Sequence, residues 1–269
     1  MRQGIVNIML ILLLLSVSIS FAQGESDWQA LNILDPLDTL IWASVISGIA
    51  IIFAIVRIDY LTNQHKKIVF TLIAAPIILA TLYLATTTVY LNIVSETGGP
   101  VHWHADIEVW NCGNWVEITD PSGLSNRIGT PVIHEHGDNR IHLEGVLLKK
   151  EKASVSTFFE SIGGAVTQTR LAVPTNRGLV ELGNGQSCNS KPGIVQIFVY
   201  KIVDGYDSQK TGYEYVQSKV DSDYIISPFS NVPPGDCIII EFDNEKDKTD
   251  KICETYTIAI NKGDMKEKI

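Results

Sequence analysis

The sequence is short of charge, above all of cations, and of methionine, and each shortage excludes a class of function. Only 19% of its 269 residues are charged and the net charge is −9. That balance argues against nucleic acid or an anionic lipid surface as partner and is compatible with the attraction of cations. The three methionines are Met1, Met9 and Met265, so a methionine-rich Cu(I) carrier is excluded.

Charge is missing altogether from two long apolar runs. Residues 39–56 form 18 consecutive uncharged residues and residues 68–95 form 28, whereas about 20 apolar residues span the core of a bilayer. Both runs are therefore predicted transmembrane helices. An earlier apolar stretch follows Arg2 and ends in Ser20-Phe21-Ala22, which predicts a signal peptide over residues 1–22.

The charges beside these runs predict their orientation. The loop 57–67 carries three basic residues against one acid, while the segment 23–38 carries four acids and no base. The positive-inside rule then makes the loop cytoplasmic. Residues 23–38 are predicted to be a short extracytoplasmic segment, and residues 97–269 an extracytoplasmic domain that the two helices anchor to the cytoplasmic membrane.

All the cysteines lie in this outer domain, at Cys112, Cys188, Cys237 and Cys253. An even number in an oxidising compartment indicates two disulfides. Four cysteines allow three connectivities, among which the sequence does not choose; we expect Cys112 with Cys188 and Cys237 with Cys253. The alternative is that one or two of them are thiolate ligands of a metal.

Alternating polar and apolar residues predict a mainly β domain, either a sandwich or an open, β-grasp-like sheet crossed by one short helix. The helix is predicted over residues 154–163, where Ser154 can cap the start and Gly163 the end. Residues 205–215 are predicted to be a polar surface loop. Strands are predicted at 101–110, 115–118, 141–148, 171–173, 179–182, 194–203, 224–226, 237–242 and 256–260.

The histidines are concentrated in one part of the domain. Two H-x-H pairs and a single histidine account for five of the six, at His102, His104, His134, His136 and His142. On a strand, the two histidines of H-x-H project from one face about 6.6 to 7 Å apart. Because neutral imidazole binds Cu, Zn, Fe and Ni, the pattern predicts a metal site, or two adjacent sites.

We expect the two pairs to supply the ligands, with His142 as an additional fifth ligand and Asp106 or Glu144 orienting a ring nitrogen from behind. His65 falls in the predicted cytoplasmic loop and is excluded. The alternative is a solvated strand face, on which the histidines only form hydrogen bonds with nearby carboxylates. The metal hypothesis depends on whether the two pairs meet in space.

Three known metal motifs match this stretch in part. HWHAD (102–106) resembles the opening of the metallo-β-lactamase hydrolases, in which Asp106 would bind a second zinc, but Ile107 stands where a histidine is expected. His102, His104 and Glu108 resemble the first half of the cupin motif, yet no histidine follows His142. A three-histidine zinc site similar to that of the α-type carbonic anhydrases stays open.

A closer resemblance is to a poorly characterised family of membrane-anchored or secreted proteins from ammonia-oxidising archaea and small-genome bacteria. It is carried by H-x-H-A-D, by H-x-H-x5-H leading to Glu-Gly, by STFFESIGG, and by VQIFVYK and PPGDCIIIEFD. It covers most of residues 100–257. The resemblance implies no established activity, but it implies an archaeal cell surface, where copper is in demand, and a β-grasp-like fold.

We therefore expect an extracytoplasmic metal-binding protein, with copper favoured over zinc, that captures or delivers copper or is an accessory subunit of a membrane copper enzyme. One alternative is an enzyme whose metal activates water, with Glu108, Glu135 or Glu144 as general base. The other is a structural or interaction module, held by two disulfides, without metal.

Overall fold

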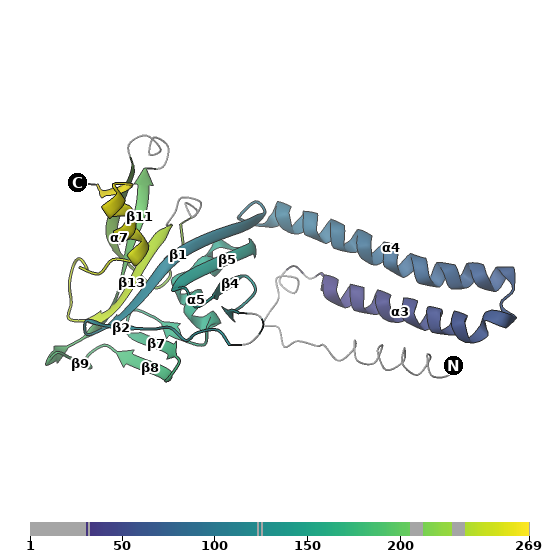
Figure 1. Ribbon diagram of the computed structural model, residues 1–269, viewed down its shortest axis with the longest axis horizontal. Helices are drawn as coiled ribbons and strands as arrows, with labels where there is room; N and C mark the ends of the chain where they lie inside the picture. The colour runs from purple at the N-terminus through teal and green to yellow at the C-terminus, as the bar shows by residue number, and fades with distance from the viewer. Residues whose placement is uncertain are drawn as a thin grey trace. The chain divides into compact units, whose positions relative to one another are not determined.

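The computed structural model describes residues 31, 33–122, 124, 126–204, 212–227 and 235–268. These residues form two compact units, of which the first ends at Val94 and the second begins at Ser95 (Figure 1). The predicted signal peptide, residues 1–22, lies outside the described residues.

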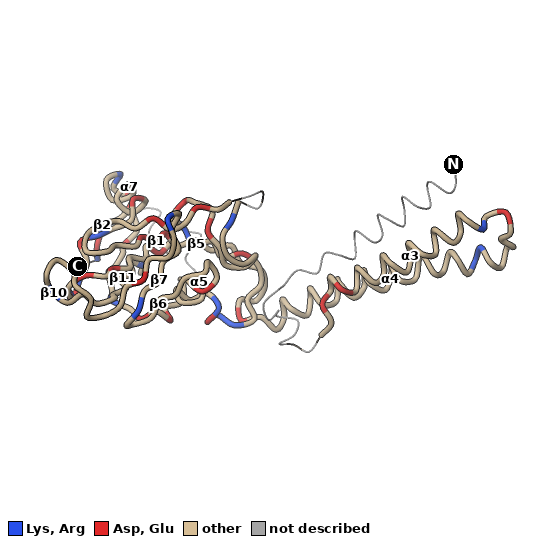
Figure 2. Tube along the Cα trace, turned by 90° about the horizontal axis from the view of Figure 1, so that it is seen from below, with Lys and Arg blue, Asp and Glu red and all other residues tan. Residues whose placement is uncertain are grey.

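The first unit consists of α3 (Pro36–Arg57), the 3-10 turn η1 (Ile58–Tyr60) and α4 (Asn63–Val94). Both helices are long and apolar enough to cross a membrane, and few of their side chains are buried. Figure 2 shows them almost without charged residues between their ends. The two predicted apolar helices are thus confirmed, although helical structure also takes up most of the predicted loop 57–67, including His65. Their orientation stays a prediction.

The second unit is mostly β. Its helical segments are η2 (Lys150–Ala153), α5 (Val155–Ser161) and α7 (Glu254–Lys262). Its strands are β1 (Pro100–Asn111), β2 (Asn114–Val116), β3 (Ile128–Gly129), β4 (Ile133–Glu135), β5 (Arg140–Val146), β6 (Ala165–Val166), β7 (Arg170–Thr175), β8 (Gly178–Gly183), β9 (Ser187–Cys188), β10 (Lys191–Pro192), β11 (Ile194–Asp204), β12 (Tyr213–Val220), β13 (Asp236–Asp243) and β14 (Met265–Glu267).

One large sheet organises this domain. Its strand order is β14-β12-β11-β13-β1-β5-β4-β3, with β2 paired to the end of β1. The pairs β1–β13 and β12–β14 are parallel, and the other pairs in the sheet are antiparallel. Smaller sheets form from β6-β7-β8 and β9-β10. The mainly β class is confirmed, while the finer assignment to a sandwich or a β-grasp stays a prediction.

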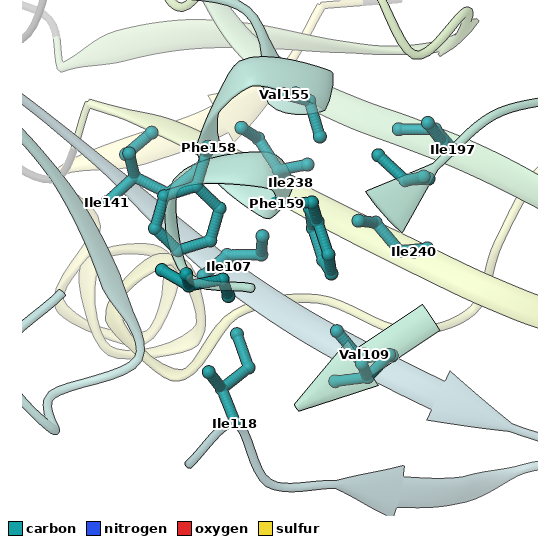
Figure 3. Packing of buried hydrophobic residues seen from close by; sticks show 14 of the residues in the cluster. Ile107, Val109, Ile118, Ile141, Val155, Phe158, Phe159, Ile197, Ile238 and Ile240 are labelled. Atoms are coloured by element: carbon teal, nitrogen blue, oxygen red, sulfur yellow. The ribbon is translucent and has the colours of Figure 1, made fainter. Parts of the chain in front are cut away.

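The large sheet carries a hydrophobic layer on each face. Ile238 and Ile240 of β13 belong to the cluster that includes Phe158 and Phe159 of α5, as Figure 3 shows. Ile239, which points the opposite way in a strand, belongs instead to the cluster of Tyr256 in α7. The two helices therefore cover opposite faces, and β1 lies in the interior of the sheet between β13 and β5.

The helix α5 follows the sequence prediction, because Ser154 caps it by accepting a hydrogen bond from the Thr157 backbone N–H. The expectation of a single helix is wrong, since residues 256–260 form α7 rather than a strand. Alternating Tyr, Thr and Ile favour a strand locally, but the buried Tyr256 hydroxyl donates to backbone carbonyls of Tyr200 and Gly235. Tertiary packing thus outweighs local preference.

Two other local predictions are corrected. Residues 213–215, expected in a loop, begin β12, which pairs with β11; residues 205–211 of that loop lie outside the described residues. Residues 224–226 make a single bridge, from Ile225 to Ser154, instead of a strand. The prediction extended the polar loop through Tyr213–Tyr215, whereas pairing with β11 makes these residues part of a strand.

The structure pairs the cysteines as expected. Cys112 is bonded to Cys188 and Cys237 to Cys253, with Cα–Cα distances of 5.5 and 5.9 Å, which suit disulfides. No described cysteine is free. The first disulfide joins the end of β1 to β9, and the second joins β13 to the residue that precedes α7. The alternative of thiolate metal ligands therefore finds no support.

Candidate metal-binding site

The five histidines of the β domain lie together on one face of the large sheet, and we call them the histidine array. His104 of β1 is directly opposite His142 of β5, and His142 is directly opposite His134 of β4. Residues directly opposite in adjacent strands share a face. Three neighbouring strands thus each contribute one histidine to a single row, and β5 is the strand that joins the two H-x-H pairs.

The remaining two histidines extend the row along the strands, because residues two apart share a face. His102 contacts His104, with ring centroids 4.5 Å apart, and His136 contacts His134 at 4.7 Å. His142 contacts rings of both pairs, at 4.7 Å from His104 and 4.7 Å from His136. The two H-x-H segments, 30 residues apart in the chain, therefore converge through His142.

The ring nitrogens within each pair face each other. The Nε2 atoms of His102 and His104 are 2.9 Å apart, and those of His134 and His136 are 3.1 Å apart. Two nitrogens bound to one metal at 2.0–2.1 Å lie about 2.9 Å apart at a right angle and about 3.3 Å apart at a tetrahedral angle. Both pairs thus have the spacing of adjacent ligands to one ion.

A three-ligand group is already assembled at one end of the array. Ligand atoms of His102, His104 and His142 all lie within 4.8 Å of one another. His142 also forms a hydrogen bond from Nε2 to Asp138 Oδ2, at 3.0 Å. His142, expected only as an additional fifth ligand, thus lies at the centre of the array, because it is the one histidine on β5, the strand between the two pairs.

The carboxylates around the array differ from those expected. Glu144 lies 3.6 Å from His102 Nε2, the nitrogen that faces His104, which is beyond hydrogen-bond distance, so its orienting role stays a prediction. Asp106 instead accepts hydrogen bonds from Arg140, at 2.7 Å, and from the Thr255 hydroxyl of α7. The carboxylate within hydrogen-bond distance of a histidine is Asp138, which the sequence analysis placed only among the carboxylates of the solvated-face alternative. Its position four residues before His142, in a G-D-N turn, was the available signal.

The turn between β4 and β5 holds Asp138 in place. Glu135 is buried, and its Oε1 accepts hydrogen bonds from the backbone N–H groups of Asp138, at 2.7 Å, and Asn139, at 3.1 Å. Glu135 therefore stabilises the turn, which argues against its expected role as a general base.

The opposite face beneath the array is a packed core. Ile133 precedes His134, and Ile141 and Leu143 flank His142. All three side chains are buried in the cluster that includes Phe158 and Phe159 of α5. Gly129 of β3, the strand that pairs with β4, has φ +112°. A Cβ at this position would lie 2.6 Å from the Ile133 carbonyl oxygen. Only glycine lets β3 approach β4 so closely, so the strand that carries His134 is held on both sides.

Exposure falls across the array. The His102 side chain is 63% exposed and that of His142 is 13% exposed, whereas His134 is 1% exposed. His134 Nδ1 is buried without a hydrogen-bond partner among the described residues, and His136 Nδ1 contacts the backbone oxygen of Asn126. The array therefore has an exposed ring at His102 and a buried ring at His134, while His104, His136 and His142 are partly buried.

Burial and neighbouring charges keep two histidines of the array, His104 and His134, neutral. Burial first, and then His142, His102 and Arg140, lower the pKa of His104 to about 4, against the raising effect of Asp138. Burial and then His136 lower the pKa of His134. Both rings are thus uncharged at neutral pH, which is the state that binds transition metals.

These shifts predict that the metal-free protein loses stability as the pH falls from about 6.5 to about 4. In that window the unfolded chain protonates these two histidines while the folded chain does not, so protons favour unfolding. Thermal unfolding in the presence of a chelator, followed across this window, measures the effect. His104→Gln should show a shallower fall in melting temperature than the wild type. An identical fall in both proteins would contradict the prediction.

A cleft of about 470 Å³ lies beside the array, on the same face of the sheet. Residues of β1 and β2, of the β4–β5 turn and of the start of α7 line it; they include Glu108, Trp110, Trp115, Asp138 and Glu254. Trp110 Nε1 donates to Glu108 Oε2 at 3.0 Å. Asp138, whose carboxylate contacts His142, is part of the lining of this cleft.

Comparison with protein-family models, with curated proteins and with solved structures finds no match. The similarity to the archaeal and bacterial family therefore stays an expectation from sequence.

Proposed function

We propose that the protein binds copper through the histidine array, outside the cytoplasmic membrane, with α3 and α4 as its membrane anchor. In this role it captures copper, delivers it, or serves as an accessory subunit of a membrane copper enzyme. The observation that carries the proposal is the position of His142, whose ring contacts both H-x-H pairs. Five imidazoles in contact, two of them kept neutral by burial, form a strong donor set for a divalent transition metal.

The preference for copper over zinc is supported by geometry and ligand type. The nitrogen spacing of 2.9 Å in the His102–His104 pair suits ligands at about a right angle, and the spacing of 3.1 Å in the His134–His136 pair lies midway between a right angle and the tetrahedral angle that zinc prefers. Tetragonal arrangements of imidazole and carboxylate are typical of Cu(II). The described domain also offers no free thiolate, the ligand most typical of structural zinc.

The test is metal content and affinity of the full-length protein in detergent, measured after stripping with a chelator. We expect Cu(II) to bind far below micromolar, the affinity that corresponds to roughly −8 kcal/mol. His142→Ala should weaken total binding by at least about tenfold, or about 1.4 kcal/mol. His65→Ala, in α4, is the matched control and should bind like the wild type. Wild-type binding no tighter than micromolar would reject the proposal and leave an anchored structural module.

A second candidate function, a metal-dependent enzyme that activates water, is favoured by the cleft. A substrate held there would lie next to Asp138 and close to the array. Glu108 lines the cleft, and burial raises the pKa of its carboxyl, which suits a general base. The test is ester hydrolysis and CO₂ hydration by the copper- and zinc-loaded protein. Turnover that Glu108→Gln removes without loss of metal would support the enzyme, and no turnover would leave metal binding alone.

A further inference from the structure

We propose that the histidine array holds two metal ions at two unequal stations rather than one ion at its centre. The outer station consists of His102, His104 and His142, and the inner station of His134 and His136. This inference rests on the proposed metal-binding function and adds its stoichiometry and the order in which its sites fill.

The spacing of the strands separates the two stations. The pairs lie on β1 and β4, with β5 between them, and adjacent strands are about 4.8 Å apart, which places the pairs about 10 Å apart at the backbone. Each pair brings its own two Nε2 atoms to within 3.1 Å. Among the described residues, no ring contact joins His102 or His104 directly to His134 or His136. Each pair is thus organised around its own point.

The two stations differ in their access to solvent. His102 in the outer station is 63% exposed and lies beside the carboxylate of Glu144, which can complete the coordination of an ion. In the inner station His134 is 1% exposed and keeps a buried Nδ1 without a hydrogen-bond partner among the described residues. Because the rings of His134 and His136 face each other through Nε2, an ion held between them is bound by one buried ring and one partly buried ring.

His142 connects the stations. Its ring is 4.7 Å from His104 on one side, and 4.7 Å from His136 and 5.7 Å from the parallel ring of His134 on the other. His102 is exposed, His136 is partly buried and His134 is buried, so an ion that enters at His102 reaches the inner station by ligand exchange. Imidazoles of the outer pair leave the ion as His134 and His136 bind it, and the ion keeps its oxidation state.

The first experiment is a titration of the full-length protein in detergent with Cu(II), followed by electron paramagnetic resonance and calorimetry. We expect two equivalents, with affinities at least about tenfold apart. Dipolar broadening of the copper spectrum should appear as the second equivalent binds, because the two ions are close. This readout needs no variant, so it stands even if a substitution impairs folding.

Paired variants assign the equivalents. His102→Gln/His104→Gln should remove the outer equivalent and keep the inner one, and His134→Gln/His136→Gln should do the reverse. His142→Gln should retain the inner equivalent but slow its loading at least about tenfold in stopped-flow mixing, whereas His65→Gln should change neither. Circular dichroism of each variant separates loss of a station from loss of the fold.

The outcomes distinguish this inference from the proposed function. A single equivalent without dipolar broadening, abolished by either double variant, would overturn the two stations and leave one shared copper site. An unchanged loading rate in His142→Gln would overturn the transfer route. Absence of any tight copper binding would overturn both the inference and the proposed function.

Discussion

Replacing Phe158 with alanine is expected to lower the free energy of unfolding of the β domain by about 3 to 5 kcal/mol, the range for a fully buried phenylalanine. Phe158 is 0% exposed, and its ring lies 5.6 Å from that of Phe159 in an edge-to-face contact. Figure 3 shows it beside Ile141, the residue that precedes His142. The cavity would therefore open beneath the strand that joins the two histidine pairs.

Urea unfolding of the metal-free protein, followed by tryptophan fluorescence, measures this loss. Phe158→Leu retains most of the buried volume and should cost less than half as much. Phe70→Ala is the matched control, since Phe70 in α4 is 70% exposed and should leave the unfolding of the β domain unchanged. A loss below about 1 kcal/mol for Phe158→Ala would mean that the helix closes the cavity at little cost.

The second large effect is expected from the Cys112–Cys188 disulfide. It closes a loop of 76 residues, whereas Cys237–Cys253 closes one of 16. If disulfides act by restricting the unfolded chain, removal of the longer loop costs about 4.5 kcal/mol and of the shorter about 3 kcal/mol. The double variants Cys112→Ala/Cys188→Ala and Cys237→Ala/Cys253→Ala allow this comparison, because each serves as the control for the other.

Both variants replace sulfur with the same small side chain, and only Cys112 is partly buried among the four cysteines, so the difference between them reports mainly the loop length. Chemical denaturation of the full-length protein under oxidising conditions gives the two free energies. If the shorter loop proved the costlier one to lose, the disulfide next to α7 would stabilise mainly by fixing the helix on the sheet. The chain-entropy explanation would then fail for this protein.

Core packing and metal binding act on opposite faces of β5. Phe158 supports β5 from one face, while the array occupies the other. A transition metal that binds only the folded domain adds RT ln(1 + [L]/Kd) to its stability. Variants that weaken the core should therefore regain stability when copper is added, and variants that remove the histidines should not.

The sequence by itself determined the elements whose signal is local. Residues 39–56 and 68–95 have to be apolar helices, because they hold no charged residue over a length that spans a bilayer. The alternation in 101–110 determined which face of β1 is polar, so His102 and His104 could be placed side by side. Ser154 and Gly163 bounded α5 because capping involves only neighbouring residues.

The tertiary structure decided the features that depend on which strands pair. His142 became the centre of the array because β5 pairs with both β1 and β4, and no local pattern encodes that order. Asp106 faces the same side as the histidines, yet it contacts Arg140 and Thr255 because α7 packs there. Residues 256–260 are helical for the same reason, since burial of Tyr256 against the sheet outweighs a strand-like alternation. Local physics thus fixed the polar face and its histidines, and long-range pairing brought those histidines to one place.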